Sequence, residues 1–199
     1  QLDVATERQP PATQTGATFA RHAGCAGPEA SECLRALTPD QILVAVERMG
    51  DDAAALGLVV DGHALTQTPM ATMRAGGGAR VPLIAGTVAD EGTIFLSQTL
   101  IPDEEAYHRF LDDTFGDVVT PFILVLYPAR DFETPWHAAA AVFGDALFTC
   151  PTREVMRAHT VRGNPGWLYY FGHVTGEGRR RGLGAYHASE VPFVFGTNA

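Results

Sequence analysis

A near-continuous apolar run, Val81–Val88, constrains the fold of this chain more than any other segment. Its length is that of a strand, and an apolar strand without alternation is typical of a parallel sheet covered on both faces. The run leads into Asp90-Glu91-Gly92, so an acidic turn follows the strand. Because working residues of such sheets lie at the carboxyl ends of the strands, we expect an α/β protein with a functional carboxylate here.

Strand and helix signals are interleaved along the rest of the chain. Thr38-Pro-Asp-Gln41 is a capping box with proline in the first turn, and it predicts a helix that ends near Met49. The segment 122–127 fits a strand by its length and a helix by its neighbours. This interleaving indicates helices layered on a mostly parallel sheet. Further helices are predicted at 69–75, from 102 onward, at 135–143 and at 151–160, and further strands at 58–62 and 166–173.

No internal repeat or clear domain boundary divides the 199 residues, of which 46% are hydrophobic. That content can fill a sizeable core, so the chain is one ordinary domain or part of a larger one. Residues 1–18 are polar and contain Pro10-Pro11, and we expect a loosely structured lead-in. Gln1 opens no apolar signal segment, so either a signal was removed or the chain begins inside a longer protein.

Charge and hydropathy exclude two classes of partner. The net charge of −9 argues against nucleic acid, which requires a concentrated positive surface. The one basic cluster, Arg179-Arg180-Arg181, lies in a Gly-rich stretch and favours a solvated loop over an anion site. No apolar run approaches the roughly 20 residues that a membrane helix needs. All fourteen basic residues are arginine, a bias that suggests a GC-rich bacterial genome.

The chain contains three cysteines. Cys25 and Cys33 bracket a short polar loop, and a disulfide between them would imply an oxidising compartment. Spacing alone leaves that disulfide and a pair of reduced thiols equally open. Cys150 precedes a proline and is expected to be a buried thiol. No Cys/His set has the close-pair spacing of a zinc site, so we expect neither metal nor cofactor.

Glu91 is the candidate acid for acid–base chemistry. A carboxylate that orients a histidine needs a rigid, shielded support, which a tight turn after a buried strand provides. Gly92 would let the backbone approach closely. The alternative is a turn or helix-capping acid. The adjacent Asp90 competes for the role but must point elsewhere.

His187 is the candidate base among the seven histidines. It lies between a flexible Gly182-Leu-Gly184 approach and an abrupt apolar exit at Val191–Phe195, which suits a base held at a pocket floor. His137 and His173 are the rivals, and we interpret both as structural. A surface or hydrogen-bonded role for His187 is the alternative.

A nucleophile is missing. The three serines are Ser31, Ser97 and Ser189, and none lies in the Gly-x-Ser-x-Gly turn that exposes a catalytic hydroxyl. Ser189 is only two residues from His187, too close for a separate support to present it to the ring. The sequence therefore does not encode a complete Ser–His–acid triad.

Five segments in sequence order form a recognisable set. They are Ala23-Gly-Cys25 with Cys33-Leu-Arg-Ala-Leu37, Val59-Val-Asp-Gly62 with Pro69, Val81–Phe95, Gly144–Pro151, and Leu183–Gly196. Together they resemble the type-B carboxylesterases, the cholinesterase-like branch of the α/β-hydrolases. The resemblance implies part of an α/β-hydrolase fold, a mostly parallel sheet flanked by helices that is incomplete without a partner segment. It also implies that residues 1–199 are an interior or C-terminal portion of one such domain.

The resemblance implies roles for individual residues. Glu91 falls on the triad acid, His187 on the triad histidine, and Glu190 on an acid often found behind that histidine. Ala188 stands where many members carry glycine. It also implies the disulfide Cys25–Cys33, and with it a secreted or periplasmic protein. Three aromatic residues are candidates for lining a substrate pocket or for the core: Phe95, Trp136 and Phe193.

The implied activity is two-step hydrolysis of a small-molecule carboxylic ester. The serine and the Gly-rich oxyanion loop would lie before Gln1, in a complementary N-terminal segment or chain. Two alternatives stay open, a non-catalytic cholinesterase-like protein used in adhesion or recognition, and an independent binding module. Retention of both Glu91 and His187 favours the esterase.

Overall fold

The computed structural model describes residues 11–197, and they fall into two compact units that divide between Pro69 and Met70. The first unit contains α1 (Ala12–His22), α2 (Ala30–Arg35), α3 (Pro39–Met49) and the 3₁₀ segment η2 (Gly50–Ala55). Helix α1 packs on α3 and buries Ala20, Ala45 and Met49.

The predicted capping box at the start of α3 is confirmed. The Gln41 N–H donates to Thr38 Oγ1 at 3.3 Å, and the Thr38 N–H donates to Gln41 Oε1 at 2.8 Å. Each bond satisfies a backbone donor that the first turn leaves without a helical acceptor.

The Cys25–Cys33 disulfide joins the loop after α1 to helix α2, with a Cα–Cα distance of 5.5 Å. The structure therefore contains the disulfide and not two reduced thiols. Cys25 is 2% exposed, so the bridge ties the loop to the interior of this unit.

Two predictions for the first unit are wrong. The first is the loosely structured lead-in expected at 1–18, of which residues 1–10 lie outside the described residues. Residues 12–18 belong to α1, which is helical because it buries Thr15 and Ala20. The expected strand 58–62 is irregular. There Asp61 Oδ1 accepts the N–H groups of the three residues 63–65 at 2.8–3.0 Å, which makes a turn.

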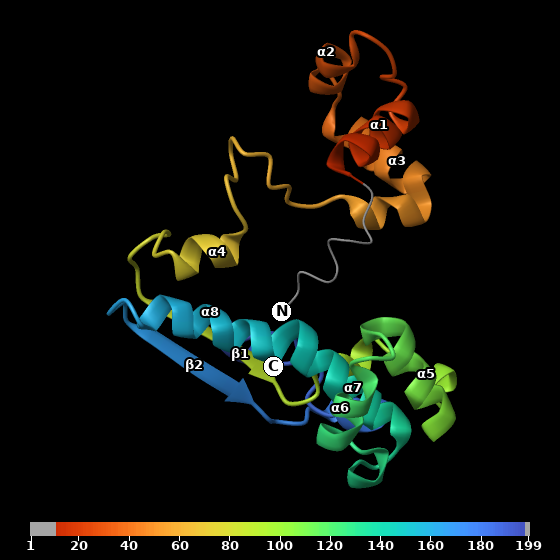
Figure 1. Cartoon of the computed structure of the whole chain (residues 1–199), viewed down its shortest axis with the longest axis vertical. Helices are drawn as coiled ribbons and strands as arrows, with labels where there is room; N and C mark the ends of the chain where they lie inside the picture. Colours follow the sequence, from red (N-terminus) through yellow and green to blue (C-terminus); the bar gives the residue numbers. More distant parts are fainter. Residues whose placement is uncertain (1–10, 198–199) are drawn as a thin grey trace. The chain divides into compact units, whose positions relative to one another are not determined.

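The second unit is built around two parallel strands, β1 (Leu83–Val88) and β2 (Gly166–Phe171). Their register runs from Leu83 opposite Gly166 to Val88 opposite Phe171. Helix α8 (Cys150–Thr160) packs along both strands (Figure 1). The predicted parallel strands with flanking helices are thus confirmed.

The remaining elements of this unit are helical. In chain order they are α4 (Pro69–Arg74), η3 (Glu91–Ile94), η4 (Gln98–Leu100), α5 (Glu104–Phe115), α6 (Thr120–Leu126), η5 (Ala129–Asp131), α7 (Pro135–Gly144), η6 (Asp145–Thr149), α9 (Gly176–Arg181) and α10 (Val191–Val194). The core lies where α5 packs against α7, with Tyr107, Leu111 and Trp136 at most 2% exposed. Burial raises the pKa of Tyr107 to about 12, and its hydroxyl donates to the Tyr127 carbonyl oxygen at 2.9 Å.

Several details differ from the sequence expectation. Residues 122–126 of the ambiguous segment lie in α6, whose first turn contains Pro121 and which packs on α5. The arginine cluster expected in a loop is helical, since Thr175 caps α9 and Glu177 pairs with Arg180. Cys150, expected to be buried, is exposed at the start of α8.

Large apolar side chains of both strands are exposed within the described residues. The apolar run at β1 predicts a strand covered on both faces, yet Ile84 is 70% exposed and its register partner Trp167 is 57% exposed. Large apolar side chains on a parallel sheet are normally covered.

Replacing both Cys25 and Cys33 by serine should lower the unfolding free energy by about 2–3 kcal/mol, because the bridge restricts a short loop in the unfolded chain. Urea denaturation followed by circular dichroism measures this. The control Cys150→Ser should change it by less than about 0.5 kcal/mol. Equal stability of parent and double variant would show that the bridge does not support this unit.

Candidate active site

Glu91 begins η3 directly after β1, and its carboxylate is buried, with 5% of the residue exposed. Its Oε1 accepts the Val88 N–H at 2.9 Å. Its Oε2 lies 2.6 Å from Nδ1 of His187, which is 96 residues further along the chain. A buried carboxylate is costly unless its oxygens are paired, and both oxygens of Glu91 have partners.

Asp90 fixes the histidine loop to the strand end. Its backbone N–H donates to the Ala185 carbonyl at 3.0 Å, and its Oδ2 accepts the Ala185 N–H at 2.7 Å. An isolated parallel bridge also joins Asp90 to Tyr186, in the segment between α9 and α10. Asp90 therefore points away from His187, as expected, and holds the backbone next to it.

Thr93 ties the same two loops together a second time. Its hydroxyl is buried, 2.8 Å from the carbonyl oxygens of Asp90 and Leu183, and shares its proton between them. Because these bonds surround the acid, the carboxylate has little freedom to move relative to the imidazole.

Gly92 lets η3 pack directly against α7. A Cβ at Gly92 would lie 2.0 Å from the Ala140 carbonyl oxygen. On the next turn of α7, a Cβ at Gly144 would lie 3.1 Å from the Cβ of Glu91. The expected close backbone approach at Gly92 is confirmed, and two glycines on facing elements make it possible.

His187 is held from one side and open on another. Its side chain is 41% exposed within the described residues. The rings of Phe148 and Phe95 lie against the imidazole, with centroids at 4.6 and 5.2 Å. The next residue, Ala188, has φ = 69°, a left-handed conformation that costs a non-glycine residue about 1–2 kcal/mol.

The pair geometry determines which nitrogen of His187 is available. A short bond to the Glu91 carboxylate requires a proton on Nδ1, so the neutral imidazole carries its lone pair on Nε2. Such a ring can accept a proton at Nε2 and become an imidazolium that Glu91 stabilises. This is the arrangement of a general base and its orienting acid.

Of the other predicted site residues, Glu190, Phe193 and Trp136 have partners other than this pair. Glu190 Oε1 accepts the Tyr169 hydroxyl at 3.2 Å, and burial followed by the Glu190 charge raises the pKa of Tyr169. The Phe193 ring contacts Phe171 and His173. Trp136 lies in the core, with its Nε1–H donating to the Leu96 carbonyl at 2.9 Å. Only Phe95 of the three candidate pocket aromatics contacts His187 through its ring.

Two residues near this pair were not predicted from sequence. Phe148 lies on a helical turn whose π geometry has no clear sequence signal. Tyr169 lies opposite Gly86 in the sheet register, where a Cβ would be 2.3 Å from its ring, so the glycine makes room for it. An aromatic residue opposite a strand glycine is the one signal that could have indicated Tyr169.

No serine in the described part of the chain bonds to His187. Ser31 accepts a bond from Arg35, and Ser97 bonds to Thr99. Ser189 is 4% exposed, with its hydroxyl buried.

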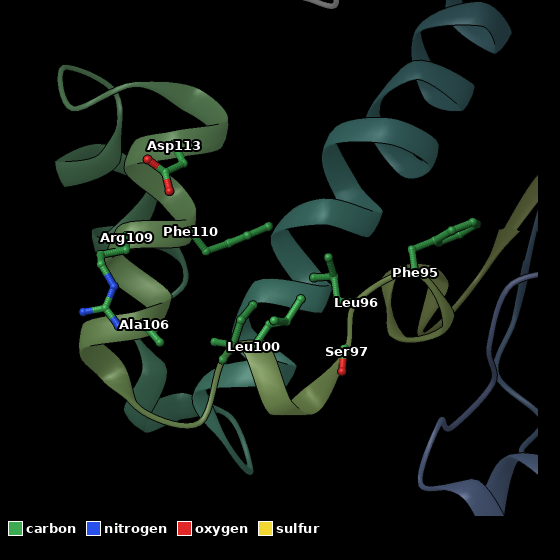
Figure 2. A pocket seen from close by; sticks show the side chains of 9 residues that line it. Phe95, Leu96, Ser97, Leu100, Ala106, Arg109, Phe110 and Asp113 are labelled. Atoms are coloured by element: carbon green, nitrogen blue, oxygen red, sulfur yellow. The ribbon is translucent and has the colours of Figure 1, made fainter. Parts of the chain in front are cut away.

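An open cavity of about 240 Å³ lies between α5 and the segment after η3 (Figure 2). Its walls are largely apolar, with Arg109 and Asp113 from α5 also lining it. Phe95 lines this cavity and also contacts His187. Within residues 11–197, no three acidic, histidine or cysteine side chains gather to hold a metal ion, and no helix is long and apolar enough to cross a membrane.

The sequence pattern of the carboxylesterase family matches residues 2–199. The chain belongs to the carboxylesterase family. Among its relatives, fumonisin B1 esterase of Sphingopyxis macrogoltabida is 30% identical over 141 residues, which are 70% of this chain and 25% of that protein. Lipase 2 of Geotrichum candidum is 27% identical over an alignment 210 residues long, which covers 90% of this chain and 36% of that protein.

The structural match gives the fold of this carboxylesterase chain. The crystal structure of carboxylesterase EST55 from Geobacillus stearothermophilus aligns with a TM-score of 0.67 and 23% identity, over 92% of this chain and 38% of that one. The chain therefore forms part of an α/β-hydrolase fold, as the sequence predicts. It spans about a quarter to a third of the length of the two curated relatives above.

Substituting Gly92→Ala should destabilise the carboxylesterase chain by about 1–3 kcal/mol, because the new methyl group would overlap the backbone oxygen of Ala140. Urea unfolding of both proteins gives the difference. The matched control is Gly172→Ala, which meets nothing within 4 Å and should change stability by less than about 0.5 kcal/mol. Equal effects at the two positions would contradict the packing described for η3.

Proposed function

We propose that this chain contributes Glu91 and His187 to the Ser–His–Glu triad of a carboxylic ester hydrolase. The observation that carries the proposal is the 2.6 Å contact between the buried Glu91 carboxylate and Nδ1 of an imidazole that is 41% exposed. Membership of the carboxylesterase family supplies the reaction class. Relatives named as an esterase and a lipase support esters as the substrates.

The serine comes from a part of the protein outside these 199 residues, in a complementary N-terminal segment or a companion chain. In support, none of the three serines lies in a Gly-x-Ser-x-Gly turn. The chain also spans only a fraction of its relatives' length. Both compact units belong to one α/β-hydrolase domain in this proposal.

The reaction proceeds in two steps. In the first, the serine oxygen attacks the ester carbonyl carbon while His187 Nε2 accepts the serine proton. His187 then gives that proton to the departing alcohol, which leaves an acyl-enzyme. In the second step water attacks the acyl carbon, His187 takes a proton from the water, and the acid is released as the proton returns to the serine.

Glu91 makes both transfers easier without moving a proton itself. Its Oε2 holds Nδ1–H and so keeps the lone pair on Nε2, and its charge stabilises the imidazolium in each step. Because the Val88 N–H fixes Oε1, the acid is oriented before the substrate binds.

Export is the remaining part of the proposal. The Cys25–Cys33 bridge supports a secreted or periplasmic location, since disulfides persist in oxidising compartments. A non-catalytic recognition role has less support, because such a role needs neither the buried acid nor its hydrogen bond to an exposed imidazole.

In the complete protein, Glu91→Gln should lower kcat for a chromogenic ester by about 10³–10⁴-fold, as neutralising the acid does in another Ser–His–acid triad. The loss arises because the amide neither selects the Nδ1–H tautomer nor stabilises the imidazolium. Steady-state kinetics measures it. Glu104→Gln, which changes an exposed carboxylate on α5, should leave kcat within about twofold. A Glu91→Gln variant with parental kcat would refute the role of Glu91.

A further inference from the structure

A single π-helical turn interrupts the long helical segment that passes His187. Helix α7 ends at Gly144, the π turn η6 spans Asp145–Thr149, and α8 begins at Cys150. One inserted residue rotates every following side chain by about 100° around the helix axis. Such turns are often retained at functional sites, because a regular helix would aim its side chains elsewhere.

Contacts at its start hold the π turn in place. The Tyr127 hydroxyl donates to Asp145 Oδ2 at 2.6 Å. Burial, and then the bond to Asp145, raises the pKa of Tyr127, so the phenol keeps its proton at neutral pH. Gly144, the residue before the turn, lies against the Cβ of Glu91. The turn is thus fixed relative to the acid of the pair.

Phe148 projects from this turn onto His187. Its ring centroid lies 4.6 Å from that of the imidazole, closer than the 5.2 Å of Phe95. Phe95 stacks on Phe148 at 5.5 Å with an interplanar angle of 18°. The two aromatic rings therefore support one another as well as the histidine.

The hydrogen bond to Glu91 does not by itself fix the imidazole. A single Nδ1–H···O bond leaves the ring free to turn about the bond axis, and such a rotation moves Nε2 away from a substrate or serine. Contact with an aromatic ring restricts that rotation, and aromatic pairs contribute about 0.5–1.5 kcal/mol beyond their burial. Because 41% of the His187 side chain is exposed, few other groups among residues 11–197 can supply the restraint.

We propose that Phe148 is a positioning residue that holds the His187 imidazole, through ring contact from the π turn, in the orientation needed for proton transfer at Nε2. This inference rests on the proposed esterase function. Because Phe148 acts through His187 in this proposal, its effect is on the chemical step rather than on binding.

The test uses the complete protein with three variants. Phe148→Leu keeps an apolar side chain and removes the ring, and Phe148→Tyr restores a ring. Phe143→Leu is the matched control, because Phe143 lies on α7 and contacts Phe95 at 5.9 Å with no ring contact to His187 among the described residues. Kinetics with a chromogenic ester gives kcat and KM for each.

We expect Phe148→Leu to lower kcat about three- to tenfold with KM within about twofold, the size of one aromatic contact converted to rate. Phe148→Tyr should recover most of the kcat, and Phe143→Leu should stay within about twofold of the parent. Parental kcat in Phe148→Leu would overturn the proposal. So would an equal loss in Phe143→Leu, since that would indicate a general packing effect.

A spectroscopic readout separates this inference from the proposed function. Proton NMR of protein labelled with ¹⁵N-histidine detects the Nδ1 proton bonded to Glu91. The signal should broaden or shift in Phe148→Leu and stay unchanged in Phe143→Leu, and an unchanged signal in both variants would overturn the proposal. If the parent hydrolyses no ester, the proposed function fails, while the NMR comparison still decides whether Phe148 restrains the ring.

Discussion

The parallel pairing of β1 with β2 is the constraint on which the site depends. The register ends with Val88 opposite Phe171, and an isolated parallel bridge then pairs Asp90, after β1, with Tyr186 in the histidine loop. That bridge brings the histidine loop, which follows α9, to the carboxyl end of β1. This is how Glu91 and His187, 96 residues apart in the chain, come within 2.6 Å.

Glu91 is buried, whereas the imidazole of His187 is partly exposed. The acid lies on the covered side, where glycines at 92 and 144 bring η3 and α7 together, and the bonds to Val88 and His187 satisfy both its oxygens. The imidazole lies at the surface of the described residues, between that acid and the rings of Phe95 and Phe148. One partner is therefore rigid and the other accessible, which an acid–base pair acting on an external substrate requires.

Sequence alone predicts the parts that follow from local patterns. The apolar run before Glu91, the capping box at Thr38 and the five family-like segments indicate the parallel strands, the start of α3 and the candidate pair. The π turn that aims Phe148 could not be predicted, because the phase shift from one inserted residue is hard to recognise in a short helical segment. Helix α6 could not be predicted either, because its apolar residues also suit a strand. Pro121 in its first turn and its packing on α5 favour the helix.

The irregular backbone at 58–62 shows a different limit. Leu58-Val-Val60 has strand propensity, but propensity becomes structure only where a neighbouring strand accepts the pairing. Here Asp61 instead binds three backbone N–H groups, and Leu58 is 87% exposed. The strand predicted before Glu91 does form, because β1 pairs with β2.

Reaction of the complete protein with a fluorophosphonate, followed by peptide mass mapping, tests the triad most directly. We expect one covalent adduct, on a serine within a Gly-x-Ser-x-Gly segment outside residues 1–199, formed at a rate that falls sharply in His187→Ala. An adduct on Ser31, Ser97 or Ser189, or labelling that does not depend on His187, would contradict it.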